Sequence, residues 1–167
     1  MISHYPLYDT ALMQNAAGVR TLFAEPEGST ATKQSEDTNM RIGGQFASKS
    51  SFEIKKIGAF VDEALARADV DALWYENYLK VLIDNKNVLQ IPLRLCAMKN
   101  AFGGVLELAS AADEVLVGLD GDGFDLRVPI IVKGGVQFKV EVHQITALST
   151  TDVPLKVILD GLYDDGN

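Results

Sequence analysis

The chain is short of the residues from which most catalytic and metal centres are built. Among its 167 residues there is one cysteine, Cys96, and there are two histidines, His4 and His143. A single cysteine excludes an internal disulfide, and two distant histidines give no zinc-ligand spacing. The sequence therefore predicts no catalytic residue, no metal ligand and no cofactor, and we do not expect an enzyme.

Basic residues and long apolar runs are also scarce. Fifteen lysines and arginines stand against 23 acidic residues, a net charge of −8. Such an acidic surface argues against direct, specific binding of nucleic acid. No run approaches the roughly 20 apolar residues of a membrane span, and residues 1–9 lack the regions of a signal peptide. We expect a soluble protein made in the cytoplasm.

What the chain does have is apolar alternation, most clearly in its last forty residues. Runs at 124–132, 136–143 and 154–163 repeat with a period of two, which is typical of strands with one buried face. The third run is expected to end as a strand at Gly161. The side chains expected inside are Leu126, Val128, Ile130, Val132, Phe138, Val140, Val142, Leu155, Val157 and Leu159.

The joint between the first two runs has two interpretations. A two-residue hairpin loop would put the apolar rows on opposite faces, so that register fails. A three-residue loop, Lys133 to Gly135, with Gly135 in the left-handed conformation, sets Ile130 against Phe138. In the alternative, the chain turns a corner and the two runs lie in opposite sheets of a sandwich.

Earlier parts of the chain show further short strands and little helix. In the run 52–61 the alternation slips, which predicts a bulge at Lys55-Lys56. Residues 62–69 suit one or two helical turns, residues 73–75 open a strand region, and 84–87 form a turn. Pro92 ends its strand or places it at an edge. The remaining strands are expected at 78–84, 88–95 and 114–119, with a long connection at 96–113.

These strands predict an all-β fold, a single eight-stranded jelly roll or sandwich, rather than any fold that alternates strands with helices. Residues 51–167 form the jelly-roll domain in this interpretation. Residues 1–50 read as an extended N-terminal arm, with loose helical character at 10–23 and a polar stretch at 28–37. Such an arm cannot bury enough apolar surface to order itself, so neighbouring subunits would order it.

Local clusters that suggest chemistry each have a simpler explanation. Asp120 and Asp122 have the spacing of a calcium loop, but Phe124 and Ile131 occupy positions where ligands belong, so a glycine-rich turn is favoured. His143 beside Glu141 is expected to be solvated. Cys96 is expected to be a buried small hydrophobe. Gly103-Gly104 lacks the lysine and helix of a phosphate loop.

Three aromatic residues near the middle of the chain leave a binding function open. Trp74, Tyr75 and Tyr78 would make a sugar-stacking platform if they shared one exposed face. An aromatic cluster that enters a strand is more often core or subunit interface. A carbohydrate-binding or adhesion jelly roll is therefore the alternative function.

An ordered set of segments resembles the single jelly-roll capsid proteins of tailless icosahedral, membrane-containing bacteriophages. The resemblance covers about residues 37–163. It rests on Asp37-Thr38-Asn39-Met40 with Gly44-Gln45, on 52–58, on a hairpin with Asn85-Lys86 at its tip, on 136–142 and on 157–163.

The resemblance implies a virion shell subunit without an active site, whose partners are other copies of itself and other capsid proteins. It leaves open whether the chain is a small major capsid protein or a minor component, and it allows for proximity to an internal viral membrane. Contacts between subunits are expected from residues 1–50 and from 96–113. Deletion of residues 1–36 is expected to leave the barrel folded and to abolish assembly.

Overall fold

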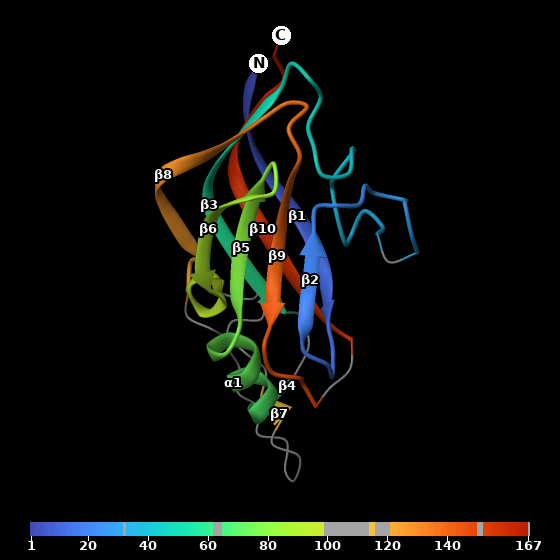
Figure 1. Cartoon of the computed structure of the whole chain (residues 1–167), viewed down its shortest axis with the longest axis vertical. Helices are drawn as coiled ribbons and strands as arrows, with labels where there is room; N and C mark the ends of the chain where they lie inside the picture. Colours follow the sequence, from blue (N-terminus) through green and yellow to red (C-terminus); the bar gives the residue numbers. More distant parts are fainter. Residues whose placement is uncertain (32, 62–64, 99–113, 116–120, 150–151, 167) are drawn as a thin grey trace.

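The structure, a computed structural model, describes residues 1–31, 33–61, 65–98, 114–115, 121–149 and 152–166. It is an all-β sandwich of two antiparallel four-stranded sheets (Figure 1). None of the helices within these ranges is long and apolar enough to cross a membrane.

The two sheets are named after their first strands. The β1 sheet has the spatial order β1 (Ile2–Met13), β10 (Val153–Asp164), β3 (Ser51–Val61) and β8 (Phe124–Lys133). The β2 sheet has the order β2 (Gly18–Leu22), β9 (Phe138–Gln144), β5 (Tyr78–Ile83) and β6 (Lys86–Pro92). At one end lie the short ribbon of β4 (Leu65–Ala66) and β7 (Glu114–Val115), the helix α1 (Arg67–Tyr75) and a 3-10 helix, η1 (Leu93–Cys96).

Strand pairing is nested about the β5–β6 hairpin. The first long strand pairs with the last, β2 pairs with β9, and β3 pairs with β8. Ile2 consequently faces Asp164, and the N- and C-termini lie side by side (Figure 1). The eight long strands therefore follow the path of one antiparallel ribbon that has been folded over onto itself.

The expected inward rows form the core, with one exception. Phe138, Val140 and Val142 of β9 and the odd-numbered residues 155–159 of β10 are buried, together with Val132 of β8. Val128 is instead 79% exposed. The β3–β8 register moves from Ile54 opposite Ile130 to Lys56 opposite Asp125, so residues 126–129 bulge away from β3. The bulge that the slip at Lys55-Lys56 predicted is seen against β10, where Ile54 faces Gly161 and Lys56 faces Asp160, so that Lys55 is the extra residue.

The prediction of a three-residue hairpin between β8 and β9 is wrong. The alternative is correct: the chain turns a corner there, and the two strands lie in opposite sheets. Ile130 pairs with Ile54 in the β1 sheet, whereas Phe138 pairs with Ile83 in the β2 sheet. The joint bonds to another segment: Gly134 N–H donates to Ser50 O at 2.7 Å, and Gly135 N–H donates to Phe46 O at 2.9 Å. Gly135 does adopt the expected left-handed conformation, with φ +74°.

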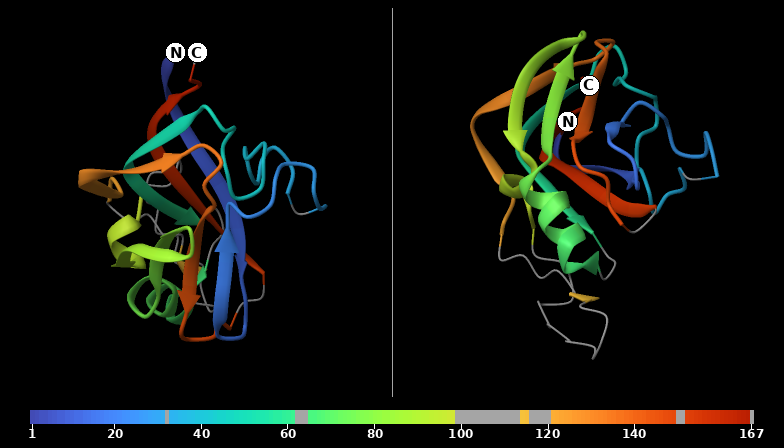
Figure 2. Two further views of the ribbon diagram at one scale, coloured as in Figure 1. Left: turned by 45° about the horizontal axis from the view of Figure 1, so that its top comes forward. Right: turned by 60° about the horizontal axis from the view of Figure 1, so that its bottom comes forward.

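The prediction that residues 1–50 form an extended arm is wrong for β1 and β2. The loose helical character predicted for residues 10–23 is wrong as well. β1 pairs along its whole length with β10, and β2 pairs with β9 (Figures 1 and 2). The alternation in β1 was hidden because Asp9 occupies an inward position between Leu7 and Ala11. Deleting residues 1–36 would remove two of the eight strands, so the expectation of a folded barrel after that deletion is withdrawn.

Residues 33–39 cover the free edge of β1. Asn39 donates to Pro6 O at 2.8 Å and accepts from Tyr8 N–H at 2.9 Å, while its own N–H donates to Tyr8 O. Thr10 Oγ1 donates to Asp37 O at 3.0 Å. An uncovered edge strand is a template for unwanted pairing, and this segment satisfies the edge from within the same chain.

Local elements in the middle of the chain were predicted with mixed success. Residues 73–75 are the last turn of α1 and not a strand, and Leu73 and Trp74 are buried there. The turn after β5 is confirmed, with left-handed φ values at Asp84 and Asn85. Pro92 ends β6, which is an edge strand as expected.

Gly161 does not end its strand. β10 continues to Asp164 through a register shift between Asp160 and Gly161. A Cβ at Gly161 would lie 2.0 Å from Glu53 O, so the close approach of β3 requires glycine there.

Candidate functional site

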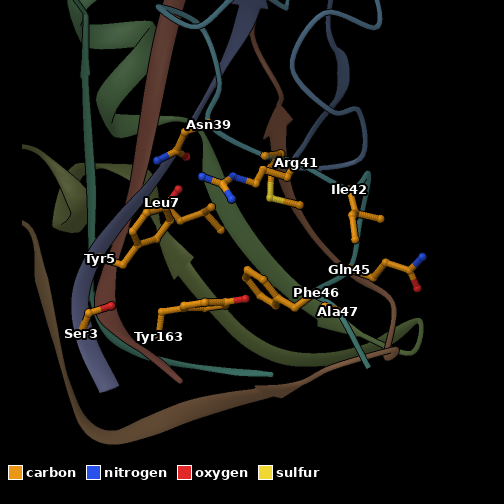
Figure 3. Close-up of a pocket in the computed structure, with 11 residues that line it drawn as sticks. Ser3, Tyr5, Leu7, Asn39, Arg41, Ile42, Gln45, Phe46, Ala47 and Tyr163 are labelled. Atoms are coloured by element: carbon orange, nitrogen blue, oxygen red, sulfur yellow. The ribbon is translucent and has the colours of Figure 1, made fainter. Parts of the chain in front are cut away.

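A pocket of about 340 Å³ lies at the end of the sandwich that carries the two termini (Figure 3). One wall is the inner face of β1 and β10, because Ser3, Tyr5 and Leu7 alternate in the same phase as the core of β1. The opposite wall is the irregular segment 39–47. The lining residues are Ser3, Tyr5, Leu7, Asn39, Met40, Arg41, Ile42, Gln45, Phe46, Ala47 and Tyr163.

Aromatic rings connect this pocket to the core. Tyr5 and Tyr163 lie 5.9 Å apart between ring centroids, and Tyr163 lies 5.8 Å from Phe46. Phe46 in turn stacks on Phe138 at 5.2 Å with an angle of 7° between the ring planes. Such stacked and tilted pairs stabilise one arrangement of the rings beyond their burial alone. The pocket wall is therefore held rigidly by the core behind it.

Arg41 supplies the positive charge of the pocket. Figure 3 shows its side chain reaching from the 39–47 segment toward Tyr5 of β1. No ion pair or hydrogen bond joins the Arg41 guanidinium to any part of the chain that the structure describes. A mostly apolar cavity with a few polar groups is the usual composition of a small-molecule site.

A buried ion pair fixes the chain just before the segment that forms this wall. Lys33 Nζ lies 2.7 Å from Asp9 Oδ1 and donates to Thr10 O at 2.7 Å. Asp9 is fully buried and also accepts from the N–H groups of Phe23 and Thr10. Further along, Gly44 N–H donates to Phe23 O at 2.8 Å. The chain that leads into the wall segment is thereby tied to β1, and the middle of the wall segment is tied to Phe23, which follows β2.

A second polar cluster lies on the outer face of the β2 sheet. Tyr78 and His143 are opposite each other in the β5–β9 register, and their rings stack at 4.6 Å. His143 Nε2 lies 3.0 Å from Glu141 Oε2, and Lys139 Nζ lies 2.8 Å from Glu141 Oε1. His143 is thus partly buried and paired with Glu141, whereas the sequence predicted a solvated side chain.

Glu141 makes stability depend on pH. Burial raises the pKa of Glu141, but hydrogen bonds from Lys139 and His143 outweigh burial and hold that pKa below its ordinary value. A lowered folded-state pKa stabilises the protein above the unfolded pKa of about 4.3, and this contribution is lost as the pH falls through the folded value.

Glu141→Gln is therefore expected to lower the free energy of unfolding by roughly 1 kcal/mol at neutral pH and by much less in acid. Urea unfolding at both pH values measures the difference. Glu53→Gln, in the exposed pair with Lys55, is the control and should change little at either pH. A Glu141→Gln deficit that persists undiminished in acid would contradict this role.

The other sequence candidates do not meet in a site. Asp122 is exposed, and Asp120 and Gly103-Gly104 lie outside the described residues. Cys96 is buried as predicted, and burial raises the pKa of its thiol to about 12, which keeps it unreactive. Within the described ranges, no group of three or more His, Cys, Asp or Glu side chains is placed to hold a metal ion.

The aromatic platform is not formed either. Trp74 is 2% exposed and Tyr75 is 62% exposed, so the two point to opposite environments. Tyr75 lies beside Arg94, whose guanidinium is 5.8 Å from its ring centroid. The geometry thus removes the main support for sugar stacking by Trp74, Tyr75 and Tyr78.

The pocket could not be found from the sequence, because its walls come from residues 3–7, 39–47 and 163, which lie far apart along the chain. The alternation of Ser3, Tyr5 and Leu7 was the available signal, but it was read as part of an arm. Comparison with known proteins adds no further assignment: the chain matches no protein-family model, no curated protein and no solved structure.

Proposed function

We propose that this chain is a jelly-roll shell subunit of a virion, made in the host cytoplasm. The observation that carries the proposal is the nested pairing of eight strands in two four-stranded sheets. If only the eight long strands are numbered along the chain, the two sheets have the orders 1-8-3-6 and 2-7-4-5, and this order supports the proposal of a jelly roll. Viral capsid domains, lectins and cupins use this architecture.

The interior of the sandwich favours the structural role among these three. The inward positions are filled by aliphatic and aromatic side chains, and the buried Asp9 is paired with Lys33. A cupin centre needs several polar side chains that converge inside the barrel. The carbohydrate-binding alternative predicts that Trp74, Tyr75 or Tyr78 are exposed together on one face, but Trp74 is buried while Tyr75 is exposed.

Contacts with neighbouring subunits are assigned to the flank where β6 and β8 are the edge strands. We call the exposed residues Val88, Leu95 and Val128 the β6–β8 flank. β6 and β8 lie side by side in Figures 1 and 2, and the bulge of β8 carries Val128 outward. Exposed apolar side chains on two sheet edges, Val88 on β6 and Val128 on β8, and on η1, which carries Leu95, suit packing against another copy of the chain or another capsid protein.

This assignment replaces the arm as the source of assembly contacts. Residues 2–22 belong to the sandwich, and residues 33–39 cover an edge of their own chain. The like charge of −8 opposes association at low salt, and screening of that charge favours it. Proximity to an internal membrane stays part of the proposal.

Assembly is tested with the purified chain by sedimentation velocity and negative-stain microscopy, across concentrations and at low and high salt. We expect oligomers or closed particles that increase with concentration and with salt. Val128→Glu should abolish them. Val19→Glu, at a residue 50% exposed on β2 at the opposite flank, is the matched control and should not.

Both outcomes that oppose the proposal are clear. A chain that stays monomeric under every condition contradicts self-association, and equal loss of assembly in both variants contradicts the β6–β8 flank. Because both valines are exposed, the glutamate variants should fold, and circular dichroism verifies this.

A further inference from the structure

We propose that the pocket at the terminal end of the sandwich binds a small carboxylate with an apolar body. The body would lie among Tyr5, Phe46 and Tyr163, and the carboxylate would accept hydrogen bonds from Arg41. This inference goes beyond the shell role and does not depend on it.

The cavity has the size and lining of a small-molecule site. A volume of about 340 Å³ is near the lower end of the range for ligand pockets. At about 30 Å³ for each water-sized unit, it holds on the order of ten non-hydrogen atoms. Leu7 and Met40 are buried behind it, so an apolar ligand would displace water from a largely apolar surface.

The charge of the ligand follows from Arg41. Two other arginines have contacts in the fold: Arg20 donates to Ala16 O at 2.9 Å, and Arg94 lies over the ring of Tyr75. Arg127 is exposed and does not line the pocket. Arg41 reaches toward Tyr5 across the pocket and has no carboxylate partner in the part of the chain that the structure describes (Figure 3). A planar guanidinium fits a carboxylate through two parallel N–H···O bonds.

Neighbouring polar groups and the overall charge are compatible with this ligand. Asn39 is already engaged by Pro6 and Tyr8, so it holds the wall and does not compete for the carboxylate. The net charge of −8 repels anions at long range, but at physiological salt that repulsion is screened beyond about 8 Å. Direct contact with Arg41 therefore decides binding.

The test compares 4-phenylbutyrate with its uncharged amide, 4-phenylbutanamide, by titrating the ¹⁵N-labelled chain and following amide NMR shifts. The shifts should move at Tyr5, Tyr163 and residues 41–47. The carboxylate should bind about tenfold more tightly than the amide. Arg41→Gln should remove this difference and leave amide binding unchanged. Arg127→Gln, at an exposed arginine in the β8 bulge, is the control and should preserve it.

A second variant tests the cavity itself. Ala47→Trp places a large ring into the pocket from an exposed wall position and should block both compounds. Equal affinity of acid and amide for the unmodified chain would overturn the proposal. So would equal weakening by Arg41→Gln and Arg127→Gln, or shifts confined to residues outside the pocket. The titration can be repeated on Val128→Glu, so that failure to assemble and failure to bind are distinguished.

Discussion

Lys33→Met is expected to lower the free energy of unfolding by about 3–5 kcal/mol. The substitution leaves the Asp9 carboxylate fully buried without its cation, although two backbone N–H groups still donate to it. Typical domains are stable by about 5–15 kcal/mol, so this is a large fraction of the total. Urea unfolding followed by circular dichroism measures the loss.

The converse change and a double variant separate the pair from its surroundings. Asp9→Leu alone leaves the Lys33 ammonium buried without its carboxylate. The double variant Asp9→Leu with Lys33→Met removes both charges, so its loss in free energy of unfolding should be smaller than the sum of the two single losses. Lys55→Met, in the exposed pair with Glu53 at 3.8 Å, is the control and should cost well under 1 kcal/mol. If Lys33→Met lowers the free energy of unfolding no more than Lys55→Met does, the Asp9–Lys33 pair does not hold the chain around Lys33 against β1.

Phe138→Ala is expected to lower the free energy of unfolding by about 3–5 kcal/mol as well. Its ring is buried and stacks on Phe46 at 5.2 Å and on Phe23 at 6.0 Å. Truncation leaves a cavity between the β2 sheet and the segment 39–47. Because Phe46 would lose its support, binding in the pocket should weaken too, which the NMR titration detects.

The matched control for this change is Phe60→Ala on the outer face of β3. Phe60 is partly exposed, and its ring lies under Lys156 Nζ at 5.8 Å. Its loss should cost about 1–2 kcal/mol, less than that of Phe138, because part of its ring stays in contact with water in the folded chain. Equal losses for the two phenylalanines would show that Phe138 is not central to the core.

The strands of the last forty residues could be predicted because their signal is local. Inward side chains such as Val140 alternate strictly with polar ones in β9, and Val157 lies in a row of alternate buried residues in β10. A period of two defines a buried face without knowledge of the partner strand. Val128 was assigned inward by the same rule. The period-two rule failed at Val128 because the β8 bulge depends on the register with β3. The run 124–132 holds no information about that register.

The pocket could not be predicted, because its residues converge only after β1 has paired with β10. Arg41 and Phe46 lie in an irregular segment without periodicity, and Tyr163 is 117 residues beyond Phe46. The composition of such a segment, taken alone, does not show which part of the chain it packs against. Asp9 and Lys33 attach it, and nothing local marks those two residues as partners.

Composition and alternation were sufficient for the all-β class and for most of the core. A scarcity of histidine and cysteine and a repeating apolar face are properties of the chain at short range, so they need no three-dimensional information. Sheet membership, the corner after β8, the place of β1 and β2 in the sandwich and the pocket required the folded chain. Each depends on pairing or packing between residues far apart in sequence, and the free energy of such contacts exists only once they are brought together.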